Sequence, residues 1–511
     1  MYFLISKAAK LFSPAETLEF HVDKMKNEME EKCNSVKNPK VGLLYLHRFF
    51  VGVLAEMTKY KEAIQSIQAA IGHQAKENSL DEDSKESYKE ALARSYCYLA
   101  VLQFRDKDYE ASLKSRRCAL DITLDMFGEQ HSNTADNYHE LATIMRTQGD
   151  CESALNFYQC ALDIRLKLFG ENSLKVASSC HELGVTHCKV KEYSTSLELH
   201  KRALKIRLET LGEEHRDTAS SYHECGVTQW YLEKYDSALD AHHKALKILH
   251  DVIGEHPKAT ADSQHEIGKT YFCLGDHRKA LQFHLHAFRT RLKVLGEQHT
   301  DTANSCFEIG VTQFEMGWYA SALQYHTHAL NMRQAMHDNS PHEEVAQSIY
   351  QLGRVQCQMG NFEEAINSLK RAFVIRTEDL EQKQDLETAY IFDEIGKAFT
   401  LKGDYTLASK MYRLALGIRE RKMGDAHASV ADSLFQLGLV EWLDGRLKES
   451  RQLNRRAAQV RRGISRKKRS ASSTFSRRIW FVKCTLVILL ILMVVSFNFI
   501  VGLSSSEKRY I

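Results

Sequence analysis

Small and apolar residues return at helical spacing along most of the chain, and this pattern predicts pairs of packed helices. In the stretch ESALNFYQCALDIRLKLFG, Ala154 and Ala161 lie seven positions apart, so both face the same side of one helix. Another small residue, Ala142, stands twelve positions before Ala154 in a preceding helical stretch. We expect two antiparallel helices to cross where these small residues let the backbones approach closely.

The helical pair recurs at a period of 42 residues. Phrases such as LGEEHRDTAS and LGEQHTDTAN place a glycine at the same point of successive units, namely Gly128, Gly170, Gly212, Gly254 and Gly296. We count ten units over residues 41–460, after an N-terminal helical segment over residues 1–40. Two helices cannot bury their apolar stripes alone, so the prediction is an all-α solenoid in which neighbouring units stack.

The segments between units predict how each helix ends and the next begins. We expect the junction glycines to be left-handed residues just past a helix C-terminus, and residues such as Asp217 and Thr218 to cap the following helix. The first two units are separated by extra residues, which we assign to a polar surface loop over residues 73–87.

The units carry the tetratricopeptide pattern, in which Leu or Ile precedes Gly in the first helix and a small residue follows twelve positions later. Leu183-Gly184 with Ser196 and Ile309-Gly310 with Ala322 are examples. The chain resembles the 42-residue tetratricopeptide repeats of kinesin light chains and nephrocystin-3-like proteins, whose junctions are of the LGEEHPDTA type. The resemblance implies a right-handed superhelix of antiparallel helix pairs and a scaffold that grips a peptide or protein segment in its groove.

The resemblance also raises an alternative function, that of a cargo adaptor of the kinesin-light-chain type. Kinesin light chains carry a long coiled coil before their repeats, where this chain has only residues 1–40. A motor heavy chain is therefore not among the expected partners.

In repeats that resemble these, the fifth and sixth positions of the first helix line the concave groove. These positions give the candidate binding residues His139, Glu140, His181, Glu182, His223, Glu224, His265, Glu266 and Glu308. A row of carboxylates beside histidines favours a ligand of basic or mixed charge. The alternative is that these charges only solvate an exposed face or bond to adjacent repeats.

Two further series of histidines follow the repeat. One occupies the aromatic position of the second helix, at His200, His242, His284 and His326, where we expect half-buried rings partnered within the repeat. The other lies in the junctions, at His131, His215, His299 and His427, and indicates junction structure. Equivalent positions of stacked units lie about 10 Å apart, whereas zinc holds its ligands at about 2 Å, so no metal site is expected.

No nucleophile and base pair, phosphate-binding loop or zinc-ligand spacing occurs in the sequence. We therefore expect no catalytic residues, no cofactor and no enzyme activity. The 511 residues are 43% hydrophobic with 4 prolines, a composition that excludes disordered, collagenous and disulfide-stapled proteins. The twelve cysteines include no CxxC pair and are expected to be reduced.

The net charge of +3 conceals an uneven distribution. Residues 451–483 hold twelve Lys and Arg and no acidic residue, whereas residues 1–450 have 55 basic against 65 acidic residues. We treat residues 461–483 as a polybasic linker that contacts anionic lipid through Arg466, Lys467, Lys468, Arg469, Arg477, Arg478 and Trp480. A basic block can also serve as a nuclear signal or nucleic-acid patch, but its place beside an apolar segment favours lipid, so nucleic acid is not an expected partner.

The apolar segment is CTLVILLILMVVSFNFIVGL, residues 484–503, followed by a short tail at residues 504–511. Twenty helical residues span about 30 Å, the thickness of the hydrocarbon core of a bilayer. The alternative, a buried helix of the array, would need a polar face that this segment lacks. The basic residues before the segment outnumber those after it, so we expect a single-pass, tail-anchored membrane protein with its array in the cytoplasm. The sequence does not specify the organelle.

Overall fold

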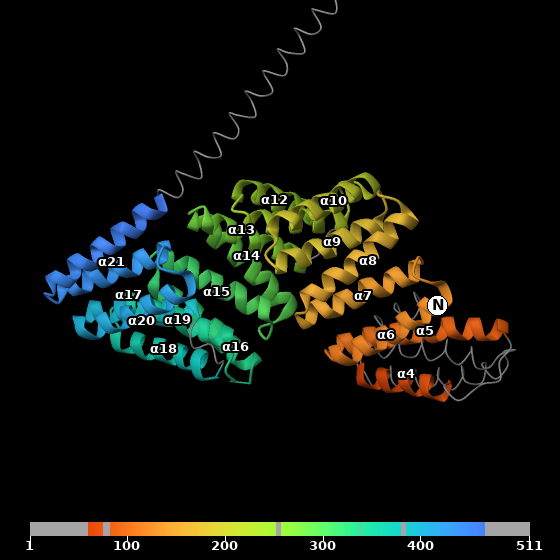
Figure 1. The fold of residues 1–511 in the computed structure, drawn as a ribbon, viewed down its shortest axis with the longest axis horizontal. Helices are drawn as coiled ribbons and strands as arrows, with labels where there is room; N and C mark the ends of the chain where they lie inside the picture. The colour runs from red at the N-terminus through yellow and green to blue at the C-terminus, as the bar shows by residue number, and fades with distance from the viewer. Residues whose placement is uncertain (1–59, 75–81, 252–256, 339, 380–384, 466–511) are drawn as a thin grey trace, which may run out of the picture. The chain divides into compact units, whose positions relative to one another are not determined.

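Helices make up all the regular structure that the computed structural model describes, over residues 60–74, 82–251, 257–338, 340–379 and 385–465 (Figure 1). Within these ranges the all-α prediction is confirmed. No described helix is both long and apolar enough to cross a bilayer. The predicted N-terminal segment 1–40, the lipid-contact residues from Arg466 to Trp480, the apolar segment 484–503 and the tail lie outside the described residues.

The chain divides into two units, Met1–Gly275 and Asp276–Ile511, which are described separately. The helices of the first unit are α4 (Tyr60–Gln74), α5 (Glu82–Arg105), α6 (Tyr109–Phe127), α7 (Ser132–Gln148), α8 (Cys151–Phe169), α9 (Leu174–Lys189), α10 (Tyr193–Leu211), α11 (Arg216–Tyr231), α12 (Tyr235–Asp251) and α13 (Pro257–Cys273). Each helix from α4 to α12 packs on the one that follows it. The surface loop assigned to residues 73–87 is partly wrong, because α5 begins at Glu82, where acidic residues in the first turn stabilise a helix N-terminus.

The second unit contains α14 (His277–Leu295), α15 (Thr300–Glu315), α16 (Tyr319–Met336), α17 (Glu343–Gln358), α18 (Phe362–Val374), the π-helical turn η1 (Ile375–Asp379), α19 (Leu386–Lys402), α20 (Tyr405–Met423), α21 (Ala428–Leu443) and a helix over residues 447–465. Successive first helices of the repeats also touch one another, as α7, α9, α11 and α13 do in the first unit and α15, α17 and α19 do in the second. We call these odd-numbered helices, together with α5 and α21, the inner layer. The right-handed superhelix expected of the whole array stays a prediction.

The two helices of a repeat cross at a glycine, but the glycine meets a ring and not the expected alanine. A Cβ atom at Gly226 would lie 2.6 Å from the Cε1 atom of His242. His200 and His326 fill the same place opposite Gly184 and Gly310, and Leu369 does so opposite Gly353. The prediction of half-buried, partnered imidazoles is wrong here, because His200, His242 and His326 are fully buried and their ring nitrogens form no hydrogen bond. The imidazole replaces an apolar side chain at this position.

Histidines at the junctions cap the first helices. The Nδ1 atom of His215 accepts a hydrogen bond from the backbone N–H of Asp217 at 3.1 Å, and the same cap recurs at His131, His299, His342 and His427. The junction prediction for this histidine series is confirmed, whereas the prediction that Asp217 or Thr218 supplies the cap is wrong. The Thr218 hydroxyl instead donates to the Gly212 carbonyl at 2.9 Å. Gly212 has φ 85° and ψ 178°, a conformation essentially confined to glycine but extended in ψ, unlike the left-handed helical one that we expected.

Buried arginines join each repeat to the next. Arg207 in α10 donates to the Asp217 carbonyl at 3.0 Å and to the Ser221 hydroxyl at 2.7 Å, both in α11. Related bonds recur from Arg165 to Ser179, Arg291 to Ser305, Arg333 to Ser348 and Arg419 to Ser433. The series is interrupted in α12, where Leu249 takes the arginine position opposite Ser263 in α13. We call these contacts the arginine clamps.

The glycine and ring contact predicts opposite effects of two alanine substitutions. Gly310→Ala should destabilise the array by about 1–3 kcal/mol, because its Cβ would lie 2.7 Å from the buried His326 ring. Gly417→Ala in α20, where no atom lies within 4 Å of the added carbon, should stabilise it by up to about 1 kcal/mol. Midpoints of urea unfolding for the two variants measure this difference. Equal shifts would contradict the close contact at Gly310.

Candidate functional site

The predicted groove histidines of the inner layer pack against the second helices of their own repeats. The His139 ring meets Tyr158 edge to face at 5.2 Å, and His223 meets His242 in the same way at 5.2 Å. His181 contacts His200 at 5.7 Å, and His265 is half-buried at the equivalent point of α13. Burial lowers the pKa of His139 to about 4 and that of His181 to about 3, so both rings are neutral at physiological pH. Whether these rings also touch a ligand stays a prediction.

The predicted carboxylates have different surroundings. Glu140 in α7 is exposed. Glu182 in α9 accepts a hydrogen bond from the guanidinium of Arg146 at 2.7 Å, and both side chains are largely covered. Glu266 in α13 binds Lys269 at 2.9 Å, and the ammonium of Lys269 lies 4.6 Å from the centre of the Trp230 ring. Glu308 in α15, in the second unit, is half-buried. The bonds of Glu182 to α7 fit the alternative in which part of the row joins adjacent repeats.

Glu224 in α11 is the exception in this row. Among the described residues, no side chain forms a hydrogen bond or an ion pair with its carboxylate. Burial raises its pKa above the ordinary value, and the neighbouring carboxylates of Glu182 and Glu266 act in the same direction. The charges of His223 and Arg146 oppose this rise. The inner layer therefore holds one carboxylate without a bound cation between two that have one.

A hollow of about 430 Å³ lies between α5 and α7, beside Glu140. Its lining mixes charges of both signs, with Glu90, Arg94, Asp136, Glu140 and Arg165 among the residues that face it. Arg165 binds Asp136 at 2.7 Å, and Arg94 pairs with Glu90. This part of the inner layer is suited to a ligand of mixed charge.

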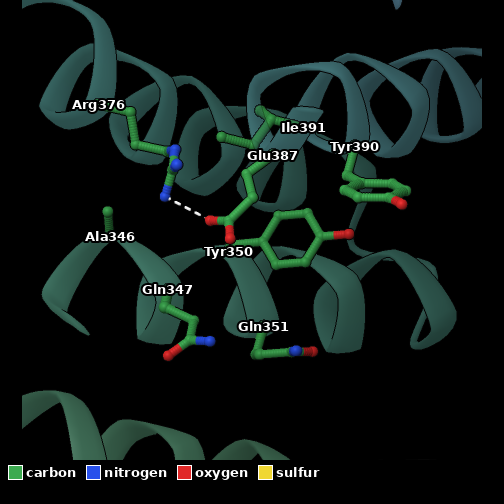
Figure 2. A pocket seen from close by; sticks show the side chains of 8 residues that line it. All are labelled: Ala346, Gln347, Tyr350, Gln351, Arg376, Glu387, Tyr390 and Ile391. Carbon is green, nitrogen blue, oxygen red and sulfur yellow. Dashed lines mark ion pairs between the residues drawn. The ribbon is translucent and has the colours of Figure 1, made fainter. Parts of the chain in front are cut away.

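A second hollow lies in the inner layer of the second unit, between α17 and α19. It has a volume of about 170 Å³ and is lined by Gln347, Tyr350, Gln351, Arg376, Glu387 and Tyr390, with Ala346 and Ile391. Figure 2 shows the Glu387 carboxylate directed toward the Tyr350 ring and bound on its other side by Arg376, at 2.6 Å. The sequence analysis missed this hollow because it followed the His-Glu pairs. Counting back from Gly353, however, places Tyr350 and Gln351 at the same two positions of the repeat as those pairs.

One group of three side chains in the described residues could approach a cation, namely His337, His342 and Glu344 at the junction before α17. The two imidazoles are stacked face to face, with centroids 3.6 Å apart, so their nitrogens do not point at a common position between them. The Nδ1 atom of His342 caps α17, and Arg333 lies 4.0 Å from the Glu344 carboxylate. These contacts assign the group to the junction.

The tetratricopeptide repeat profile matches residues 91–167, 175–250, 259–335 and 385–463, and a second profile with the same description matches residues 348–383. None of the curated proteins is a match for this chain.

Several solved structures share the fold at low sequence identity. The apo quorum sensor NprR from B. thuringiensis is 12% identical, with 74% of this chain and 99% of that chain covered and a TM-score of 0.52. BtubC (BKLC) from P. vanneervenii is 20% identical over 48% of this chain and 95% of that chain, with a TM-score of 0.41. A candidate kinesin light chain from Podosopora anserina with nearly identical TPR-like repeats is 20% identical over 41% and 98%, with a TM-score of 0.36.

The buried second-helix histidines predict a loss of stability in weak acid. Burial lowers the pKa of His242 from 6.5 to about 2, so below pH 6.5 the unfolded chain takes up a proton that the folded chain does not. The contribution of His242 should cost about 2 kcal/mol of stability at pH 5 and nothing at pH 7.5.

His242→Leu removes this proton uptake while keeping a side chain that fits, since Leu369 occupies the same position opposite Gly353. Unfolding midpoints at pH 7.5 and pH 5 should therefore differ less in the variant than in the unaltered chain. The same pH dependence in both would rule out proton uptake at His242 as a cause.

Proposed function

Because the chain belongs to the tetratricopeptide repeat family, a group of protein-binding and peptide-binding repeats, we propose that it is a non-enzymatic scaffold held on a membrane by its C-terminal segment. In this proposal the inner layer binds a peptide or protein segment, and the array faces the cytoplasm. The membrane and the binding partner are separate parts of the proposal and have separate tests.

The carboxylate of Glu224 is the observation that supports a ligand of basic or mixed charge. Glu182 and Glu266 on either side of it are neutralised by Arg146 and Lys269, whereas Glu224 has no such cation among the described residues. A partly buried carboxylate without a cation is costly, and a lysine or arginine side chain of a ligand would relieve that cost through a charge-assisted hydrogen bond. The mixed charges around the hollow at Glu140 extend this preference along the inner layer.

The sequence supports the membrane anchor. Residues 484–503 carry no charge over a length that matches a bilayer, and the basic residues before them follow the rule that positive charge stays on the cytoplasmic side. Arg466, Lys467, Lys468, Arg469, Arg477, Arg478 and Trp480 are the residues proposed to contact lipid headgroups. The kinesin-type cargo adaptor remains the alternative, and precipitation of the chain from cells without a motor heavy chain would exclude it.

The ligand proposal predicts that Glu224→Gln weakens capture of basic peptides. The test is an array of immobilised nonapeptides with varied numbers of Lys and Arg, probed with the chain lacking residues 479–511. We expect binding to favour Lys- and Arg-containing peptides and to fall about tenfold in Glu224→Gln, the size of one charge-assisted hydrogen bond. Glu198→Gln, which removes an exposed carboxylate on α10, is the matched control. An equal effect of both substitutions would exclude Glu224 as the contact.

The anchor proposal predicts that the full chain resists extraction of membranes with alkaline carbonate, whereas a chain that ends at residue 478 is released. The reason is that only an inserted apolar helix survives removal of peripheral proteins. Immunoblots of pellet and supernatant provide the measurement. Release of both chains would rule out a membrane-spanning segment.

A further inference from the structure

The last helix of the inner layer differs from the others in the residues that it presents. In α19, three positions of the inner layer are polar, Asp393, Lys397 and Thr400. The equivalent positions of α21 hold Phe435, Leu439 and Trp442. These three side chains lie four and three residues apart and therefore share one face of α21. We call this face the α21 stripe.

The α21 stripe is uncovered by the described residues. Phe435 is 45% exposed, Leu439 41% and Trp442 57%. Phe307 occupies the position of Phe435 in an earlier repeat and is only 6% exposed. An arginine lies over both rings, Arg333 over Phe307 at 4.6 Å and Arg461 over Phe435 at 5.5 Å. What differs is the next inner-layer helix, because α17 contacts α15 and no described helix follows on α21 in the same way.

An uncovered apolar end is a liability in a stacked array, and arrays of this kind close with a terminal segment that covers it. The other large apolar side chains near the end of the array add to the stripe, since Leu443 and Leu447 are also exposed. A segment that covers this face needs a run of apolar residues about as long as α21, which spans 16 residues.

The remaining sequence offers one such run. Residues 466–483 carry seven Lys and Arg and are unsuited to an apolar face. Residues 484–503 are apolar over twenty positions. The eighteen residues between Ser465 and Cys484 reach up to about 60 Å when extended, whereas α21 is about 24 Å long. The apolar segment can therefore reach the stripe and lie along all of it.

We propose that residues 484–503 dock on the α21 stripe as the terminal cap of the array when the chain is not in a membrane, and leave it on insertion. The inference rests on the proposed anchor only in that the same residues serve both states. A bilayer and the stripe compete for one apolar surface, so the two states exclude each other. The array thereby shields its own anchor between synthesis and insertion.

Photocrosslinking of the full chain tests this. Trp442→p-benzoylphenylalanine places a crosslinker in the stripe, and Trp318→p-benzoylphenylalanine, at an exposed tryptophan before α16, is the matched control. The chain is purified without detergent, irradiated alone or with phosphatidylcholine and phosphatidylserine vesicles, and mapped by mass spectrometry. Mixing isotopically light and heavy chains separates crosslinks within a chain from crosslinks between chains.

We expect crosslinks from position 442 to residues 484–503 of the same chain, at least fivefold above position 318 and lost when vesicles are added. Crosslinks between chains would assign the stripe to a second copy and overturn the proposal. Crosslinks to lipid alone, no crosslink to residues 484–503, or a full chain that precipitates without detergent would also overturn it.

A second variant keeps the test independent of the crosslinker. Leu439→Glu should release the segment, so that binding of the dye ANS by the membrane-free full chain rises at least twofold. The same substitution in the chain that ends at residue 478 should lower ANS binding, because it only removes apolar surface there. A fall in both chains would overturn docking. Carbonate extraction of the full chain reports insertion alone, so failure of the anchor and failure of docking give different results.

Discussion

Stacking of one helix pair on the next is the interaction on which the rest of this structure depends. A pair has apolar residues on more than one side, and only its neighbours can cover them. The inner-layer helices touch along each unit, and every buried side chain of the glycine crossings and arginine clamps belongs to one repeat or to two adjacent ones. Stability is therefore local, and no large central core exists in which a deep catalytic pocket would form.

Histidine serves three purposes in this array, and each depends on a neutral ring. At the crossings, His200, His242 and His326 are flat, fully buried fillers without hydrogen bonds. At the junctions, a residue such as His215 uses one nitrogen as an acceptor for a helix N-terminus. On the inner layer, His139 and His181 pack edge to face on the second helix. A residue type that suggests metal binding or catalysis in a sequence is here mainly structural.

The repeat period revealed the helices, their pairing and the position of the inner layer, because these follow from spacing alone. It did not reveal which atoms meet. The cap at His215, the ring at Gly226 and the clamp at Arg207 all depend on side-chain direction, which one sequence does not encode as a pattern of residue types. The arginines do recur at the repeat spacing, so the signal for the clamps was present. Glu224 differs from Glu182 only through Arg146, a residue of another repeat, and the sequence pattern treats both carboxylates alike.

The leucine at position 249 marks a weak joint in this construction. Elsewhere along the described junctions, a polar side chain at this position bonds to the following repeat, whereas between α12 and α13 the contact is apolar and Ser263 instead meets His223 at 3.4 Å. An apolar contact tolerates sliding that a directional bond resists. Under tension, or during exchange of backbone amide hydrogens, the first unit should therefore part between α12 and α13 before it parts at a clamped junction.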